Sequence, residues 1–298
     1  MFTDSLRYVC EVVRADPDGP VACFARGGIA SRDSVERRLG SVRVAALEHE
    51  GWLRPNDNAD GRDGVQLTVS LEVFNGLISV LPVEQDLGAD YVHVNSDSFW
   101  LLDLVWEHAS GGTWAAELGI GNGIVAAHLA AKYTRVVGTD LAGPWIRYAQ
   151  LTLEANEARG RPTGAVVTDV GSGLRRGVFD LVVSNTPWSP SSPVDDDGRA
   201  MTFMAGGPTG TELPSRFLLD AADLLAPGGL AILLCFDPTF DDGSRPLQRT
   251  LDEIGARGHR VELIDSPIMP PELITPRLQA RLPRLRHGAH VAVLIRRP

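Results

Sequence analysis

From about residue 97 onward, apolar segments of strand length alternate with segments whose apolar residues have helical spacing. Strands that alternate with helices in this way form a mostly parallel sheet with helices packed on both faces. The predicted strands are 114–120, 135–139, 165–168, 179–184, 230–236, 260–264 and 290–295, and the predicted helices are 97–108, 123–133, 144–159, 211–225 and 246–257. This alternation predicts an α/β fold with a doubly wound sheet.

Residues 1–92 lack this alternation and are expected to form a smaller α/β unit. Helical apolar spacing covers 5–15 and 31–50, and Ser31 is placed to cap the second helix. A turn rich in glycine, aspartate and asparagine follows, and 65–80 is rich in strand-forming residues. Helices followed by a short β unit are compatible with a winged helix or with a cap over a substrate pocket.

The chain is therefore expected to divide into an N-terminal cap or substrate-recognition domain, 1–92, and a larger domain, 93–298. The formal net charge is −10. A chain this acidic is not built for sequence-independent attraction to a polyanion. The charge favours a cap over a DNA-binding wing, and it favours a small-molecule or peptide partner over a nucleic acid.

The cysteines and the absence of long apolar runs predict where the protein works. Cys10, Cys23 and Cys235 are far apart and form neither a metal-binding spacing nor a disulfide framework. No apolar run approaches the roughly 20 residues of a membrane helix, and the N-terminus lacks the pattern of a secretory signal. These features predict a cytoplasmic protein with no metal site and no membrane contact.

Two groups of titratable residues have no evident partner in the sequence. Arg277, Arg281, Arg284 and Arg286 form a basic stretch that is either solvated or in contact with an anionic substrate group. His290 lies in the last predicted strand. We expect it to be a structural histidine with satisfied hydrogen bonds rather than a base.

A glycine-rich turn connects the first predicted strand of the larger domain to the following helix. It contains Glu117, Gly119, Gly121 and Gly123. Glycines allow the backbone to pass close to a ligand, and the start of a helix offers free N–H groups. A dinucleotide fingerprint would require a third glycine at position 124, where this chain has Ile124. The turn therefore predicts a nucleotide-like ligand of another class.

Two carboxylates follow at the ends of the next two predicted strands. A carboxylate at the position of Asp140 can accept both ribose hydroxyls of a nucleoside. Asp169 ends the third strand, where it could accept a hydrogen bond from an adenine amino group. Because the carboxyl ends of parallel strands share one edge of the sheet, both carboxylates are expected near the glycine turn.

The fourth predicted strand ends in the tetrad Asn185, Thr186, Pro187 and Trp188, here called the acceptor motif. The glycine turn, the two aspartates and this motif, in this order, resemble the class I S-adenosylmethionine-dependent methyltransferases. The motif is similar to the Asn-Pro-Pro-Tyr/Phe/Trp motif of amino-methylating enzymes. The chain most resembles the release-factor glutamine methyltransferases and their ribosomal-RNA relatives, and 203–210 and 225–229 also fit that group.

This resemblance covers about residues 92–298, makes 93–298 the catalytic domain and implies S-adenosyl-L-methionine as the cofactor. It also implies a seven-stranded Rossmann-like sheet whose last strand, 290–295, is antiparallel. The implied cofactor-binding residues are Glu117, Gly119, Gly121 and Gly123 around the methionine half, Asp140 at the ribose, Leu141, Asp169 and Val170 at the adenine, Asp97 and Ser98 where this family closes over the cofactor, and Asn185.

The acceptor motif carries the implied catalytic roles. The side chain of Asn185 and the backbone carbonyl of residue 186 would accept hydrogen bonds from the target nitrogen, and Trp188 would stack on a planar substrate group. Two such acceptors rotate a delocalised nitrogen lone pair toward the methyl group and stabilise the growing positive charge. Thr186 replaces the proline of the family, so the carbonyl is kept while the rigid Pro-Pro geometry is lost.

The sequence thus predicts an S-adenosylmethionine-dependent N-methyltransferase. The first choice of acceptor is an amino or amide nitrogen of a small molecule or peptide, with natural-product tailoring as the setting. The alternatives are methylation of ribosomal RNA or of a protein glutamine, O-methylation, and a regulator that binds the cofactor without catalysis. The intact acceptor motif argues against the regulator, because a pure binder does not need it.

Overall fold

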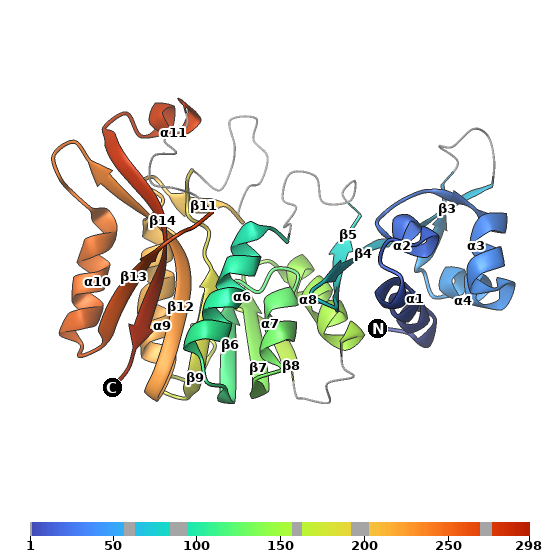
Figure 1. The fold of residues 1–298 in the computed structure, drawn as a ribbon, viewed down its shortest axis with the longest axis horizontal. Coiled ribbons are helices and arrows are strands. Elements are labelled where there is room, and N and C mark those ends of the chain that lie inside the picture. The colour runs from blue at the N-terminus through green and yellow to red at the C-terminus, as the bar shows by residue number, and fades with distance from the viewer. Residues whose placement is uncertain (1, 57–62, 84–93, 157–162, 192–202, 269–275) are drawn as a thin grey trace.

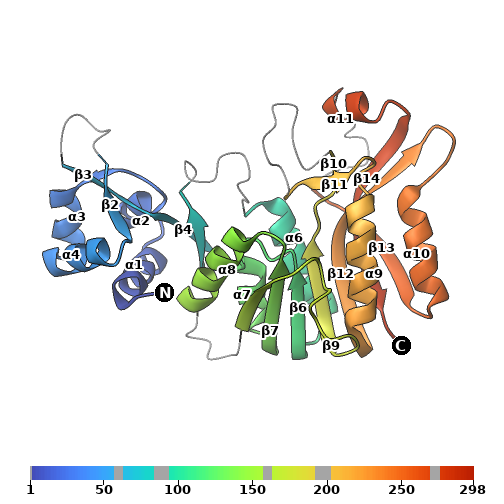
Figure 2. The same ribbon diagram turned by 180° about the vertical axis from the view of Figure 1, so that it is seen from behind.

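The structure is a computed structural model that describes residues 2–56, 63–83, 94–156, 163–191, 203–268 and 276–298. The domain boundary expected between residues 92 and 93 lies outside the described residues. Figures 1 and 2 show a larger α/β part and, at one end of it, a smaller N-terminal unit that contains α1 to α4. No described helix is long and apolar enough to cross a lipid bilayer.

A seven-stranded sheet with the order β13-β14-β12-β9-β6-β7-β8 forms the centre of the described larger part. Neighbouring strands from β12 to β8 are parallel. The last strand, β14, pairs antiparallel with both β12 and β13, as predicted. The strands are β6 (Gly112–Leu118), β7 (Tyr133–Asp140), β8 (Thr163–Val167), β9 (Phe179–Asn185), β12 (Leu225–Phe240), β13 (Arg260–Asp265) and β14 (Leu285–Arg296).

Helices cover both faces of this sheet, which confirms the doubly wound α/β prediction. One face packs against α6, α7 and α8, and the other packs against α9 and α10. Because the central strands are covered on both sides, their residues are apolar almost without alternation. These helices are α6 (Ser96–His108), α7 (Ile124–Leu129), α8 (Gly143–Ala155), α9 (Glu212–Leu224) and α10 (Pro246–Ala256).

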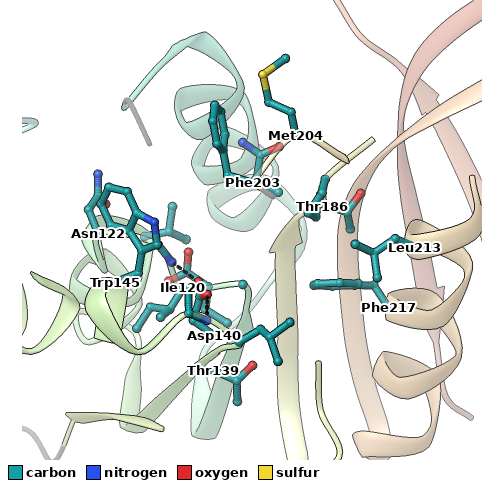
Figure 3. A pocket seen from close by; sticks show the side chains of 18 of the residues that line it. Ile120, Asn122, Thr139, Asp140, Trp145, Thr186, Phe203, Met204, Leu213 and Phe217 are labelled. Atoms are coloured by element: carbon teal, nitrogen blue, oxygen red, sulfur yellow. Dashed lines mark hydrogen bonds between the residues drawn. The ribbon is translucent and has the colours of Figure 1, made fainter. Parts of the chain in front are cut away.

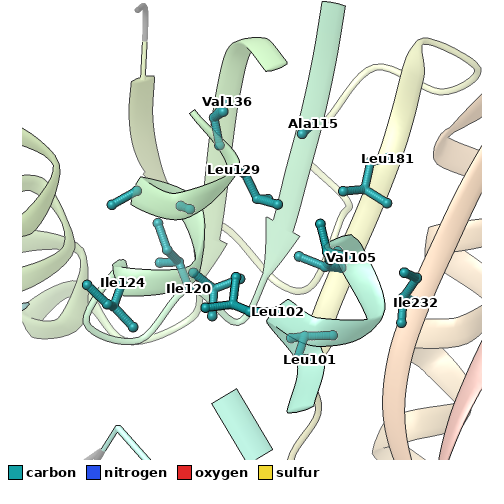
Figure 4. Close-up of a cluster of buried hydrophobic side chains, with 14 of the residues drawn as sticks. Leu101, Leu102, Val105, Ala115, Ile120, Ile124, Leu129, Val136, Leu181 and Ile232 are labelled. Atoms are coloured by element: carbon teal, nitrogen blue, oxygen red, sulfur yellow. The ribbon is translucent and has the colours of Figure 1, made fainter. Parts of the chain in front are cut away.

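The larger core cluster lies between the sheet and α6 to α8 (Figure 4). Leu101 and Val105 of α6 pack with Leu129 of α7 against Leu181 and Ile232 of the sheet. Full burial of an aliphatic side chain of this size contributes roughly 1.5–3 kcal/mol. This packing fixes α6 and α7, whose first residues reach the site described below.

Several elements differ in length from their predicted ranges, and β14, predicted over 290–295, spans Leu285–Arg296. The helix predicted over 123–133 ends at Leu129, because the chain turns there and enters β7 at Tyr133. The strand predicted over 230–236 extends to Phe240, and its last residues pair with β14 beyond the end of β9. This extended hairpin and α11 (Pro276–Arg281) form a small apolar cluster that also packs against Trp188.

The N-terminal unit consists of helices and a three-stranded antiparallel sheet with the order β1-β3-β2. This strand order and the helices before it are those of a winged helix, and the role of the unit as a cap or substrate-recognition domain stays a prediction. The helix predicted over 31–50 is two helices, because Gly40 at a φ of 85° interrupts it. Ser31 caps the first of them, as predicted. The elements are α1 (Asp4–Ala15), α2 (Pro20–Ala25), β1 (Ala30–Ser31), α3 (Arg32–Leu39), α4 (Ser41–His49), β2 (Leu53–Pro55) and β3 (Gly64–Leu67).

A hairpin of β4 (Val69–Phe74) and β5 (Leu77–Pro82) connects the two parts through α8 (Figure 1). Thr152 of α8 accepts a hydrogen bond from the N–H of Val80 at 2.9 Å. Asn156, one turn later, accepts from the N–H of Ile78 at 3.1 Å and donates to its carbonyl at 2.8 Å. A side chain of α8 and the side chain of its C-cap residue therefore satisfy buried backbone groups of β5 and hold the hairpin in place.

Candidate active site

The site lies where the direction of the sheet changes. The chain runs from β6 outward through β7 to β8 and then returns to β9 on the other side of β6. In open α/β sheets this switch point, at the carboxyl ends of the strands, is where ligands bind. A cavity of about 450 Å³ opens there (Figure 3). No described residue before Asn95 lines it.

The structure brings almost all of the predicted site residues together around this one cavity. Residues from seven separate segments of the sequence meet there. The predicted residues that line it are Asp97, Ser98, Glu117, Gly119, Gly121, Asp140, Leu141, Asp169, Val170, Asn185, Thr186, Pro187 and Trp188. Gly123 is the one predicted residue that is not part of the lining.

The glycine turn after β6 has a backbone that other residues would adopt only with strain. Gly119, Gly121 and Gly123 have φ angles of 70°, 50° and 82°, which lie in the left-handed region that favours glycine. A Cβ atom on Gly123 would lie 2.9 Å from the Cα atom of Ala149 in α8. Gly123 therefore allows α7 to pack closely on α8, whereas Gly119 and Gly121 form the wall of the cavity.

Glu117 supports the turn from inside. Its side chain is only 4% exposed and accepts a hydrogen bond from the N–H of Ala126, in the first turn of α7, at 2.7 Å. Burial raises the pKa of this carboxyl well above its ordinary value, and the nearby Asp140 carboxylate raises it further. Glu117 thus caps α7 and fixes the turn.

Asp140 joins two turns beside the cavity (Figure 3). One carboxylate oxygen accepts from the N–H of Gly121 at 3.0 Å, and the other accepts from the N–H of Ala142 at 2.9 Å. Each carboxylate oxygen can accept a second hydrogen bond, so the group can still bind ribose hydroxyls. Trp145, at the start of α8, lies beside Asp140, and Leu141 is 70% exposed.

Asp169 and Val170 form the next part of the wall. Val170 has a φ of 50°, which is an outlier for a β-branched residue and costs roughly 1–3 kcal/mol. The turn is closed by a hydrogen bond from the N–H of Ser172 to the carbonyl of Asp169 at 3.1 Å. The Asp169 carboxylate forms an ion pair with Arg216 of α9 at 2.6 Å.

The first turn of α6 contributes a buried carboxylate. Asn95 caps α6 by accepting from the N–H groups of Asp97 and Ser98 at 3.1 and 3.3 Å. Burial raises the pKa of the Asp97 carboxyl above its ordinary value. Among the described lining residues, four carboxylates therefore surround the cavity, and a ligand with positive charge suits them. They are Asp97, Glu117, Asp140 and Asp169.

The acceptor motif begins at the last residue of β9. Asn185 pairs with Leu234 of β12, and the hydroxyl of Thr186 donates to the carbonyl of Leu234 at 2.6 Å. Thr186 is almost completely buried. Its hydroxyl therefore ties the motif to the neighbouring strand, at the position where the family has a proline.

A second segment holds the motif from the other side. β11 (Ala205–Gly207) pairs with β10 (Ser189–Pro190), and the N–H of Ser189 donates to the carbonyl of Met204 at 2.9 Å. A Cβ atom on Gly206 would lie 2.8 Å from the Cα atom of Trp188. Glycine at this position thus permits the close contact, and Phe203 and Met204 beside it face the cavity (Figure 3).

His290 differs from its predicted role as a satisfied structural histidine. It is 3% exposed, and neither ring nitrogen has a hydrogen-bond partner among the described residues. Its ring lies 4.9 Å from that of Trp188 and 5.4 Å from that of Trp100 in α6. Burial lowers the pKa of His290 to about 4, so the ring is neutral near neutral pH.

The sequence reasoning missed several lining residues. Asn95 had a local signal, since it stands two residues before the helix predicted over 97–108 and is of a capping type. Leu213 and Phe217 project from α9 toward the cavity (Figure 3), but apolar residues of an amphipathic helix give no indication that they face a ligand. Asn122 and Trp145 depend on the path of the turns and were not detectable from the pattern.

The residues present fit a cationic nucleoside cofactor. Left-handed glycines bring backbone close to the ligand, Asp140 can accept ribose hydroxyls, and buried carboxylates suit a sulfonium and an amino group. The acceptor motif lines the same cavity. The arrangement can therefore hold a methyl donor and orient a nitrogen acceptor beside it.

Comparisons with known proteins agree with this geometry. The model of the methyltransferase small domain family matches residues 98–235. Methyltransferase HEMK2 of Mus musculus is 32% identical over 154 residues, which cover 46% of this chain and 68% of that protein. The release factor glutamine methyltransferase of Moorella thermoacetica is 33% identical over 129 residues, 40% of this chain and 44% of that protein.

A solved structure supports the fold alone. A putative transferase from Pyrococcus horikoshii has a TM-score of 0.50 and 12% sequence identity, and the match covers 97% of each chain. The fold, the site and the relatives together lead to one conclusion: this chain belongs to the class I S-adenosyl-L-methionine-dependent methyltransferase family that includes HEMK2 and the release factor glutamine methyltransferases.

Proposed function

We propose that this methyltransferase methylates the side-chain amide nitrogen of a glutamine in a protein acceptor. The observation that carries the proposal is the acceptor motif, which lines the same cavity as the cofactor residues. The glutamine methyltransferase among the relatives favours this acceptor over the small molecule that the sequence first suggested.

The reaction is mainly a problem of orientation. The cofactor supplies an electrophilic methyl group when it is bound. The side-chain oxygen of Asn185 and the carbonyl of Thr186 accept the two N–H bonds of the amide, so the nitrogen lone pair turns toward the methyl carbon. With S-adenosylmethionine bound, its methyl group would pass to this nitrogen, the sulfur would keep the electron pair of the broken carbon–sulfur bond, and one amide proton would be released to water. The same two acceptors stabilise the positive charge on nitrogen before that proton is lost.

The surroundings of the motif support an uncharged acceptor group. Trp188, Phe203 and Met204 provide apolar walls. Two of the four arginines in the basic stretch near the C-terminus have partners: Arg284 pairs with Asp241 and Asp242, and Arg281 donates to the carbonyl of Pro190. Arg286 is exposed. The side chain of Arg277 lies outside the described residues. An amide of a polypeptide therefore fits this region better than a phosphate-rich RNA.

Labelled S-adenosylmethionine tests the proposal on separate acceptors. The full chain is incubated with a release factor, with ribosomal RNA or with small amides, and the labelled product is digested and analysed by mass spectrometry. We expect one methylated glutamine in the protein, and labelling about 10²-fold slower with the Asn185→Ala variant. Label on a nucleoside, with binding that weakens steeply as salt rises, would contradict the proposal, as would label on small amides alone.

The reducing cytoplasm stays the predicted location. Cys10, Cys23 and Cys235 are all free thiols. Two of them, Cys10 and Cys235, are buried, and their burial raises the thiol pKa to about 12. Fractionation of cells that express the tagged chain checks this expectation.

A further inference from the structure

One face of α9 is fastened to the segment that follows β8. Arg216, Asp220 and Asp223 are spaced so that they share this face. Arg216 forms the 2.6 Å ion pair with Asp169. Asp220 accepts from the N–H of Gly171 at 3.1 Å, and it also forms an ion pair with Arg176 at 3.0 Å. We call these contacts the α9 row.

Of the three α9 residues in this row, only Arg216 bonds to a residue that lines the cavity. Asp169 is part of the lining, whereas Gly171 and Arg176 are not. Leu213 and Phe217, on either side of Arg216 along α9, face the cavity (Figure 3). Arg216 itself is not part of the lining, so it holds the Asp169 carboxylate from behind the cavity wall.

The ion pair limits how Asp169 can turn. Both side chains are about half exposed, and an unpaired exposed carboxylate would rotate between several positions. The contact with Arg216 uses one carboxylate oxygen, Oδ2, so Oδ1 can accept another hydrogen bond. The left-handed backbone of Val170 fixes the chain next to it. The backbone conformation and the ion pair together restrict Oδ1 of Asp169 to one orientation.

We propose that Arg216 is a positioning residue that directs the Asp169 carboxylate at the cofactor's base and thereby makes the site selective for adenine. The amino group of adenine donates a hydrogen bond to a carboxylate. Hypoxanthine has a carbonyl at the same ring position, and that oxygen is repelled by the carboxylate. The inference depends on Asp169 facing the base, which a separate variant tests.

Calorimetry with two ligands provides the test. The full chain is titrated with S-adenosylhomocysteine and with its inosine analogue, for the wild type and for Arg216→Met. Because exposed ion pairs are weak, we expect Arg216→Met to weaken adenine binding about twofold to fivefold, with little change for the inosine analogue. The preference for adenine should therefore fall by the same factor.

Arg176→Met is the matched control, because Arg176 supplies another guanidinium of the α9 row and its contacts are with Asp220 and Asp223, not with Asp169. It should leave the preference unchanged. In an Asp169→Asn background, Arg216→Met should have no further effect on the preference, since the two residues act as one pair.

Two results would overturn the inference. One is an unchanged preference in Arg216→Met although Asp169→Asn lowers it, which leaves Asp169 at the base without help from Arg216. The other is an equal loss in Arg216→Met and Arg176→Met, which would indicate only a general loosening of the loop. If Asp169→Asn itself changes neither affinity nor preference, Asp169 does not face the base and the inference fails at its first step.

Discussion

The two halves of the cavity are built in different ways. The cofactor half comes from three successive turns, each at the end of one strand, around Gly121, Asp140 and Asp169. The acceptor half joins Trp188 to Met204 from a later loop, and His290 from the last strand packs behind Trp188. The first half depends on local turn chemistry, and the second depends on contacts between distant segments. Changes in the second half are therefore expected to alter the acceptor and to leave cofactor binding intact.

The largest expected effect is a loss of turnover in the acceptor half that leaves cofactor binding in the other half unchanged. Asn185→Ala removes a hydrogen bond that forms fully only when the nitrogen is placed for attack. It should lower kcat and kcat/KM together by about 10²-fold or more. The affinity for S-adenosylhomocysteine should stay close to that of the wild type in calorimetry. Full methyl transfer by this variant would remove the acceptor motif from the chemistry.

The second change affects the cofactor half. Asp140→Ala removes a carboxylate that holds two turns and is proposed to hold the ribose. Loss of a charge-assisted hydrogen bond should weaken S-adenosylhomocysteine binding by roughly tenfold to a hundredfold. Calorimetry measures this directly, and a melting curve without ligand separates it from loss of folding. Equal affinity in variant and wild type would exclude Asp140 from the cofactor site.

The third prediction uses pH to examine the residue behind the acceptor motif. The pKa of His290 is lowered to about 4 in the folded state from 6.5, so the unfolded chain binds the proton more strongly. The stabilisation from the neutral buried ring is present above pH 6.5 and is lost as the pH falls toward 4. Between pH 7 and pH 5 the loss should be about 2 kcal/mol.

Urea unfolding at several pH values measures this loss. His290→Phe keeps an aromatic ring and should flatten the pH dependence by that amount. His287→Phe, a change at an exposed histidine of the same strand, is the control and should leave the wild-type slope. Identical slopes in all three proteins would show that His290 is not buried as a neutral ring.

The smallest effect concerns the close contact between the two loops of the acceptor half. Gly206→Ala places a Cβ atom 2.8 Å from the Cα atom of Trp188, so the backbone beside the motif must shift. Small misplacements of a positioning element are costly, and the acceptor KM should rise about fivefold to tenfold with unchanged cofactor affinity. Gly255→Ala in α10, where a Cβ atom meets nothing within 4 Å, is the control. Equal kinetics in both variants would mean that the contact relaxes without consequence.

Local patterns in the sequence were sufficient for the sheet and for most of the cofactor half. These patterns are the strand and helix periods, the glycines with left-handed φ angles and the acids at strand ends. Each of them involves only a few neighbouring residues. The family resemblance, and not these patterns, predicted the antiparallel last strand. The predicted residues from Asp97 to Trp188 line one cavity, with Gly123 as the exception. Gly123 is set apart by its contact with Ala149, which lies in another helix.

Only the tertiary structure decided the contacts between segments that are far apart in the chain. Arg216 meets Asp169, Thr186 is tied to Leu234, and His290 is buried against Trp188. Nothing near these residues in the sequence identifies the partner, because a helix face or a strand neighbour is selected by packing of the whole core. Turn geometry is determined by the backbone preferences of adjacent residues, whereas such pairs exist only after the sheet order has brought their strands and helices together.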